Sequence, residues 1–481
     1  MVVGGTVLVL ALLGWGLQRP AVGDQSDQDA QQRLQQEGER GRQQPPSPLL
    51  GVDVLFVAWE VALFAPLAGA LVLLLGLFRK ATRQDSDDSS GDESTSSSEE
   101  EEEDPAEQWG HRRFLEHINP WTAQRLARRS KVVEALVGDL VHACQLLTSK
   151  TLLPRLQPCI GVGSAFEGWS PGRDATVYSL LVPLKPPTGY SFHLELGTGG
   201  ELPARHGHVR VQLQCVCQRQ RLLGDALCFL HHPEAQRGRH EGPDFLQHLC
   251  THSYLDVGKT TCWLQLLVMN AWLLLPASHR CKLRLLPSAR SCKLRLETPS
   301  GMPLFIDIVL GVQQGHSGIY LTGQEAEAGL TSSTTWLESC AVPEALFFGL
   351  VARQAPRDTC YLECLQLFAR LLRGNSFSSY CLKTVVMHLL TATPLTSWRR
   401  AEVLERLNDV LHYLHHCLEQ KQLHHFLLGN DRVPVQLLLP TAFRTASPLN
   451  LFQHLVQDPP AHAQALRDFE ELQDRLWSLL E

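Results

Sequence analysis

The chain has 481 residues, 44% of them hydrophobic, and a formal net charge of −7. This length is sufficient for two or three domains with a sizeable apolar core. Acidic residues are concentrated in residues 85–104, so the rest of the chain is mildly basic. No basic stripe with interleaved aromatic residues is present, and we therefore do not expect a nucleic-acid-binding protein.

The N-terminal segment has the features of a secretory signal. Residues 1–17 are apolar, and Ala21 and Gly23 are small residues that suit cleavage by signal peptidase. We predict a signal peptide over residues 1–23, with an uncleaved signal anchor as the alternative. The next residues are polar and then Pro-rich, and they cannot bury enough apolar surface to offset their ordering entropy, so 24–53 is predicted to be a short extracellular stem.

Residues 54–78 are the candidate membrane span. The last eighteen of them carry no charge, and as a helix they would measure about 27 Å against a hydrocarbon core of about 30 Å. Arg79, Lys80 and Arg83 follow at once, so the positive-inside rule places the remainder in the cytosol. The pattern predicts a single-pass type I protein of the plasma membrane, with an acidic, Ser-rich cytosolic linker over 79–106.

Residues 107–335 show mixed α/β patterning. A long helix is expected from Pro120, because apolar residues recur there at helical spacing. Strands are expected from β-branched and alternating patterns at residues 176–184, 208–217, 281–285, 292–296 and 305–312. The sequence CKLRL begins both the third and the fourth of these strands, which indicates two similar amphipathic strands.

Residues 336–481 show helical patterning instead. Apolar stripes predict helices over 360–372, 380–390 and 401–428, with Gly374 and Pro394 ending the first two. The chain is therefore predicted to combine an α/β domain with an all-helical part.

The cysteines favour a reduced protein without a metal site. All fourteen follow residue 140 and are widely spread, as is typical of buried thiols. Zinc-binding side chains occur in four places: Cys215 and Cys217 with His231 and His232, Cys360 with Cys364, His415 with His416, and His424 with His425. Strand alternation or helix packing explains the cysteine pairs, the histidine pairs are typical of a helix edge, and no four-ligand set has a familiar spacing. We expect neither a metal nor a cofactor.

Four features match the skeleton of a nucleotidyltransferase site. Gly163 and Ser164 could form the turn whose amides hold a triphosphate, although a Gly-Ser pair is also common in ordinary loops. Glu167 or Asp174 could then hold a metal. Asp307 lies inside an apolar strand, where a buried carboxylate requires a metal, a donor from the turn or a neighbouring base.

The cytosolic part resembles the Mab-21 domain group of nucleotidyltransferase-fold proteins. Within that group it is similar to the inositol trisphosphate receptor-interacting protein family, in its like-1 branch. The matching stretches are GSAFEGW at 163–169, LVPLKPP at 181–187, CVCQRQRLLGDALCFLHH at 215–232, VLGVQ at 309–313, LHHFLLGN at 423–430 and PLNLFQHLV at 448–456.

The resemblance implies the fold, the type I topology and a loss of catalysis. Active members of the wider fold carry a Glu-x-Asp pair on the first strand and a third Asp on a later strand. Here Arg173 and Ala175 stand at the positions of the pair, and only Asp307 fits its position. Two divalent ions need several carboxylates, so these residues would hold them poorly.

These observations lead to three hypotheses. The first is a membrane-anchored, non-catalytic regulatory protein that interacts with inositol trisphosphate receptors and modulates calcium release, as the resemblance implies. The second is a cell-surface ligand that binds a receptor on another cell through its stem. The third is a residual nucleotidyltransferase with metal at Asp307.

Overall fold

The computed structural model describes residues 120–149, 151–170, 176–197, 206–214, 245–299, 301–324, 332–372 and 377–479. The predicted signal peptide, stem, membrane span and acidic linker (1–23, 24–53, 54–78 and 79–106) lie outside these residues.

A mixed sheet of twelve strands forms the first half of the described chain. Its two central strands, β3 (Val177–Lys185) and β10 (Pro303–Gln313), run parallel, with Ile308 opposite Leu180. Both strands are rich in Val, Leu and Ile, and the sequence predicted both of them. Apolar residues of this kind favour strands that are buried on both faces.

The remaining strands extend this centre on both sides. On the outer edge of β3 lie β1 (Arg155–Leu156) and β2 (Ile160–Val162). The first half of β10 pairs with β9 (Cys292–Glu297), which pairs with β8 (Lys282–Leu286), as the repeated CKLRL predicted. From the second half of β10 the sheet continues through β11 (Tyr320–Thr322), β12 (Trp336–Ser339), β5 (His206–Leu213), β7 (Tyr254–Leu255) and β6 (Cys250–Thr251), and β4 (Tyr190–Leu196) pairs with β5.

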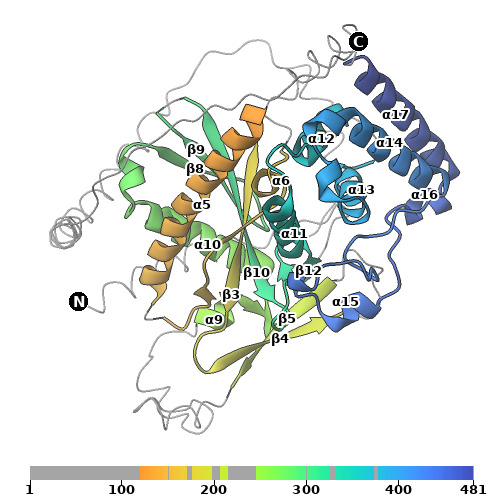
Figure 1. Ribbon diagram of the computed structural model, residues 1–481. Coiled ribbons are helices and arrows are strands. Elements are labelled where there is room, and N and C mark those ends of the chain that lie inside the picture. The colour runs from red at the N-terminus through yellow and green to blue at the C-terminus, as the bar shows by residue number, and fades with distance from the viewer. Residues whose placement is uncertain are drawn as a thin grey trace, which may run out of the picture. The chain divides into compact units, whose positions relative to one another are not determined.

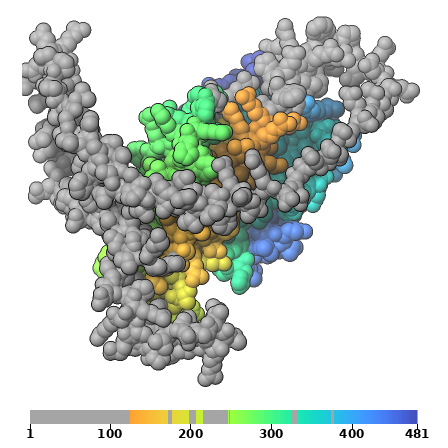
Figure 2. Space-filling model, turned by 90° about the vertical axis from the view of Figure 1, so that its left-hand side faces the viewer, coloured from red at the N-terminus to blue at the C-terminus, as the bar shows by residue number. Residues whose placement is uncertain are grey.

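Two long helices cover one face of the sheet. They are α5 (Pro120–Thr148) and α10 (Val257–Trp272) (Figure 1). The buried stripe of α5 includes Val133, Val137 and Leu140, which recur at the spacing of a helix face. Asp256 caps α10 by accepting a hydrogen bond from the backbone N–H of Lys259. In Figure 2, α5 is orange and lies beside the green part of the chain, with the helical half behind in teal and blue.

The helical half has a core of its own. Its helices are α11 (Ala341–Gln354), α12 (Tyr361–Leu371), α13 (Ser379–Ala392), α14 (Val403–Glu419), α15 (Thr441–Thr445), α16 (Gln453–Gln457) and α17 (Pro459–Trp477). Trp169, which follows the one-turn helix α6 (Ser164–Glu167), is buried in the same core. The segment after β2 therefore joins the sheet to the helices.

One predicted helix ends earlier than the sequence indicated. The apolar stripe predicted a helix over 401–428, but α14 stops at Glu419. Lys421 adopts a left-handed conformation with φ of 53°, and the backbone N–H of Leu423 donates to the side-chain oxygen of Asn450. The side chain of Asn450 thus accepts the hydrogen bond that a backbone carbonyl would accept if α14 continued. Strand β5 likewise ends at Leu213, and residues 215–217 of the predicted strand lie outside the described residues.

The prediction of a single-pass type I membrane protein is wrong for the chain as the structure describes it. No helix within the described ranges combines the length and the apolar character that a bilayer span requires. The longest of them, α5, has 29 residues but carries Arg125, Lys131 and Glu134 along its length, and charged side chains are costly in hydrocarbon. We therefore correct the fold class to an α/β sheet followed by helices. The predicted plasma-membrane location is corrected on the same finding.

Two glycines provide a matched test of local packing. A Cβ atom at Gly161 would lie 2.2 Å from the ring of Phe166, whereas at Gly138, inside α5, it would meet no atom within 4 Å. Gly161→Ala is therefore expected to lower the free energy of unfolding by about 1–3 kcal/mol. Gly138→Ala should raise it by up to about 1 kcal/mol, because alanine favours helix interiors. Chemical denaturation of both variants checks this, and equal shifts would contradict it.

Candidate functional site

The Gly-Ser turn leads from β2 directly into α6. Gly163 has φ of 79°, which favours glycine, and its carbonyl accepts hydrogen bonds from the backbone N–H groups of Phe166 and Glu167. Neighbouring helices hold this segment in place, because Ser130 of α5 donates to the carbonyl of Ala165 at 2.9 Å. The turn is thus a fixed part of the fold.

The sheet register places the turn and Asp307 at the same end of the central strands. Val162, just before the turn, pairs with Ser179 of β3, and Ser179 pairs with Asp307 of β10. Two strand spacings therefore separate the turn from Asp307, a backbone distance of about 10 Å. Asp174, with Arg173 and Ala175, lies outside the described residues. Asp307 is therefore the predicted acid that the described structure places at this end of the central strands.

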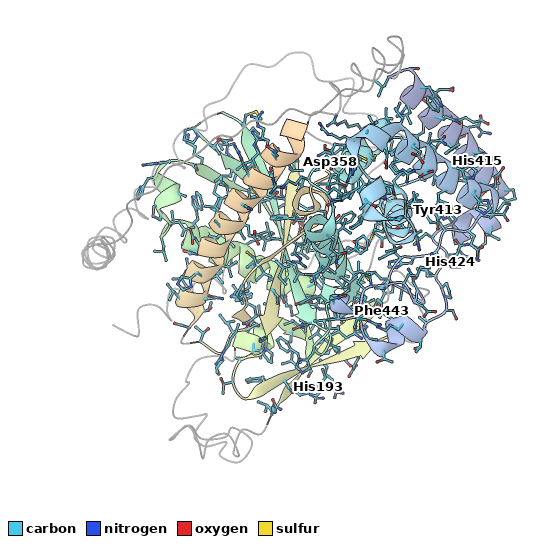
Figure 3. All side chains as sticks on the ribbon, viewed as in Figure 1. His193, Asp358, Tyr413, His415, His424 and Phe443 are labelled. Atoms are coloured by element: carbon cyan, nitrogen blue, oxygen red, sulfur yellow. The ribbon has the colours of Figure 1, made fainter. Side chains whose placement is uncertain are left out.

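The candidate zinc ligands do not gather in the part of the chain that the structure describes. No group of three or more His, Cys, Asp or Glu side chains there is arranged to hold a metal ion. Cys360 and Cys364 are buried free thiols at the start of α12. His415 and His424 lie apart on the helical half (Figure 3). Cys215, Cys217, His231 and His232 lie outside the described residues.

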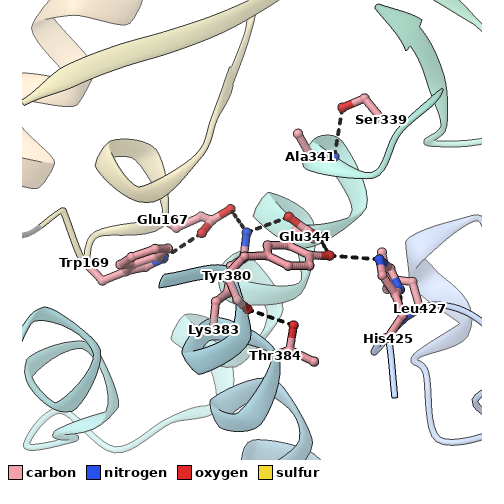
Figure 4. A network of polar contacts seen from close by, with 10 residues as sticks. All are labelled: Glu167, Trp169, Ser339, Ala341, Glu344, Tyr380, Lys383, Thr384, His425 and Leu427. Carbon is pink, nitrogen blue, oxygen red and sulfur yellow. Dashed lines mark hydrogen bonds and ion pairs between the residues drawn. The ribbon is translucent and has the colours of Figure 1, made fainter. Parts of the chain in front are cut away.

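Glu167 points away from the sheet and into the helical half (Figure 4). Its side chain is fully buried, with 0% exposed surface. One carboxylate oxygen accepts a hydrogen bond from Nε1 of Trp169, and the other lies 2.6 Å from Nζ of Lys383 on α13. The predicted metal-holding acid is therefore engaged in an ion pair inside the protein.

The same lysine contacts a second buried carboxylate. Nζ of Lys383 lies 2.6 Å from Oε2 of Glu344 on α11. The other oxygen of Glu344 accepts a hydrogen bond from the hydroxyl of Tyr380, which lies 2.8 Å from Nε2 of His425 (Figure 4). We call these five residues, Glu167, Glu344, Tyr380, Lys383 and His425, the buried network. It connects α6, α11, α13 and the segment after α14.

Burial and charge act against each other in this network. Burial raises the pKa of Glu167, and the positive charge of Lys383 opposes that rise. Burial also works against the charged form of Lys383, but the two carboxylates outweigh it, so the pKa of Lys383 lies above its usual value. Lys383 therefore stays charged, and an unpaired charge at this depth would cost several kcal/mol.

The hydrogen bonds of His425 determine which of its nitrogens carries the proton. Burial lowers the pKa of His425 to about 4, so the ring is neutral at neutral pH. Its Nδ1 accepts a hydrogen bond from the backbone N–H of Leu427, so Nε2 carries the proton and donates to Tyr380. The Tyr380 hydroxyl in turn donates to Glu344. Every donor in this series of hydrogen bonds has an acceptor, as a stable buried network requires.

The sequence contains a signal for this network that lies outside the nucleotidyltransferase motif. Lys383 stands inside the apolar run Cys381–Met387, whose members are all buried. A lysine in such a run is almost never fully buried unless it is paired. That rule predicts a buried acidic partner, although it does not identify Glu167 or Glu344.

The comparisons with known proteins agree with this architecture. The Mab-21 protein HhH/H2TH-like domain matches residues 360–438. Over 369 residues the chain is 39% identical to inositol 1,4,5-trisphosphate receptor-interacting protein-like 1 of Rattus norvegicus, an alignment that covers 75% of this chain and 67% of the relative. It is 30% identical to inositol 1,4,5-trisphosphate receptor-interacting protein of Homo sapiens over 384 residues, covering 76% of this chain and 70% of the relative.

Proposed function

Because the chain belongs to the inositol 1,4,5-trisphosphate receptor-interacting protein family, we propose that it is a non-catalytic regulatory protein that binds the inositol 1,4,5-trisphosphate receptor. Its nucleotidyltransferase-like core then serves as a binding scaffold. We further propose that this binding modulates calcium release through the receptor.

The observation that carries the non-catalytic part of the proposal is the position of Glu167. A two-metal nucleotidyl transfer needs several carboxylates that face one cleft. Glu167 is buried between Trp169 and Lys383 and holds two parts of the fold together, so it is not available to a metal ion at the sheet. Of the predicted acids within the described ranges, Asp307 then remains, and it alone would compensate little of the roughly four positive charges of two divalent ions.

Binding to the receptor is the direct test. The purified full-length chain is immobilised, and the detergent-solubilised inositol 1,4,5-trisphosphate receptor is passed over it. We expect saturable binding, and we expect Asp307→Asn to bind with unchanged affinity because the partner contacts do not depend on a metal at this position. Absence of receptor binding by the folded parent protein would overturn the choice of partner.

A product assay tests the residual-enzyme hypothesis separately. The parent protein and Asp307→Asn are incubated with the four nucleoside triphosphates and Mg²⁺ or Mn²⁺. We expect no nucleotidyl product from either protein. A product that the parent forms and Asp307→Asn does not would replace the non-catalytic proposal, whatever the result with the receptor.

A further inference from the structure

One face of the β8–β9 hairpin is strongly basic. Side chains of directly paired residues lie on the same face of a sheet, and here Arg284 pairs with Arg295 and Lys282 with Glu297. Lys293, two residues before Arg295, shares this face. The alternate residues of β9, such as Leu294, pack into the core on the other side. We call Lys282, Arg284, Lys293 and Arg295 the basic face.

Positive charge on this face exceeds what nearby carboxylates compensate. Like charges directly opposite each other on paired strands destabilise a sheet, and Arg284 and Arg295 stand in that relation. Glu297 is shared between them, because one of its oxygens lies 3.4 Å from Nε of Arg284 and 3.8 Å from Nη2 of Arg295. Asp307 stands opposite Lys293 in the sheet register and is the second carboxylate on this face. Among the described residues of these three strands, four cations thus face two carboxylates, which leaves a net charge of +2.

The arginines retain hydrogen-bonding capacity. The side chains of Arg284 and Arg295 are 63% and 42% exposed. A guanidinium group carries several N–H donors, and each of these two groups contacts Glu297 through a single nitrogen atom. A guanidinium group with unused donors matches the oxygens of a phosphate, which it can bind through two parallel hydrogen bonds.

The spacing of these charges favours a small ligand with linked phosphates. Cβ atoms of directly paired residues lie about 5 Å apart, so the two arginines can bind neighbouring phosphates of one molecule. The face is only two short strands wide and is bounded by Glu297 and Asp307, which would repel a long nucleic acid strand. We therefore infer that the basic face binds a compact polyphosphate without requiring a metal ion.

This site is separate from the Gly-Ser turn and independent of the proposed function. In the sheet register, Lys293 of β9 stands opposite Asp307 of β10, which stands opposite Ser179 of β3. Ser179 in turn stands opposite Val162 of β2, the residue before the turn. The backbone distance from β9 to the turn is therefore about 14 Å. Figure 2 views the molecule from the side on which β8 and β9 lie in Figure 1, and the green part of the chain is visible there.

The test uses the full chain and inorganic tripolyphosphate as the probe. Binding is measured by isothermal titration calorimetry at low ionic strength with EDTA present. We expect tripolyphosphate to bind at least tenfold more tightly than orthophosphate at matched ionic strength. The double variant Arg284→Gln/Arg295→Gln should weaken tripolyphosphate binding at least tenfold, whereas Glu297→Gln should strengthen it severalfold because a competing carboxylate is removed.

Arg128→Gln is the matched control, since Arg128 is exposed on α5. It should leave the affinity unchanged, and unfolding midpoints establish that all variants fold. Competition of ATP and of inositol hexakisphosphate with tripolyphosphate then shows whether the face prefers a nucleotide or an inositol phosphate. Equal affinity for orthophosphate, unchanged binding by the double variant, or the same loss in Arg128→Gln would each overturn the inference.

Discussion

Replacing Lys383 by methionine is expected to lower the free energy of unfolding by about 3–5 kcal/mol. Methionine has a similar length, so the expected loss arises from charge. Lys383 is the cation that lies between the buried carboxylates of Glu167 and Glu344, each at 2.6 Å. Without it, two carboxylates remain buried side by side, or take up protons at a cost. Chemical denaturation of the full chain measures the difference.

Two further variants separate charge from packing. Lys131→Met removes an exposed lysine from α5 and should change stability by less than about 0.5 kcal/mol. Adding Glu167→Gln and Glu344→Gln to Lys383→Met should restore at least half of the lost stability, because the remaining amides carry no charge. If Lys383→Met costs no more than Lys131→Met, the ion pairs do not hold the sheet and the helices together.

Acid is expected to destabilise the protein through His425. Burial lowers the pKa of His425 from 6.5 to about 4, so the unfolded chain binds this proton more tightly than the folded one. The stability that the neutral ring contributes is therefore present above about pH 6.5 and is lost as the pH falls toward about 4. The gap corresponds to about 3 kcal/mol. His425→Asn should make stability less dependent on pH in this window.

The neighbours of His425 define how that experiment is interpreted. Burial also lowers the pKa of His388, which adds to the acid sensitivity, whereas the raised pKa of Glu167 acts in the opposite sense. The relevant quantity is thus the difference in unfolding free energy between the parent and His425→Asn, measured from pH 4 to pH 7. His415→Asn, at a side chain 44% exposed on α14, is the control. Parallel pH profiles for the parent and His425→Asn would contradict a neutral buried His425.

Local patterns in the sequence identified the central strands of the sheet, the β8–β9 hairpin and several of the long helices. The two CKLRL segments alternate between apolar and charged residues, and they form β8 and β9. The apolar strand around Asp307 is β10, and the apolar stripe after Pro120 is the buried side of α5. Periodicity works for α5 and β9 because one face of each is buried, which restricts the residues that can occupy it. The strand β10 is recognised instead by its continuous apolar run, as expected for a strand buried on both faces.

The sequence also identified the family, and the comparisons confirm this. The stretch LHHFLLGN at 423–430 contributed to that resemblance. It does not form the end of a long helix, because Asn450 takes the hydrogen bond of Leu423 and the chain turns at Lys421. Residues 27 positions apart decide this boundary. A periodic pattern read along one segment cannot include such a contact.

The role of Glu167 was decided by the tertiary structure. As a motif residue it follows a Gly-Ser turn and resembles a metal ligand. In the fold it pairs with Lys383, 216 residues later, and a second carboxylate, that of Glu344, shares the same cation. A carboxylate has the same chemical form whether it holds a metal ion or an ammonium group. Only the three-dimensional arrangement, which buries Glu167 beside Lys383 away from the sheet face of Asp307, distinguishes between the two.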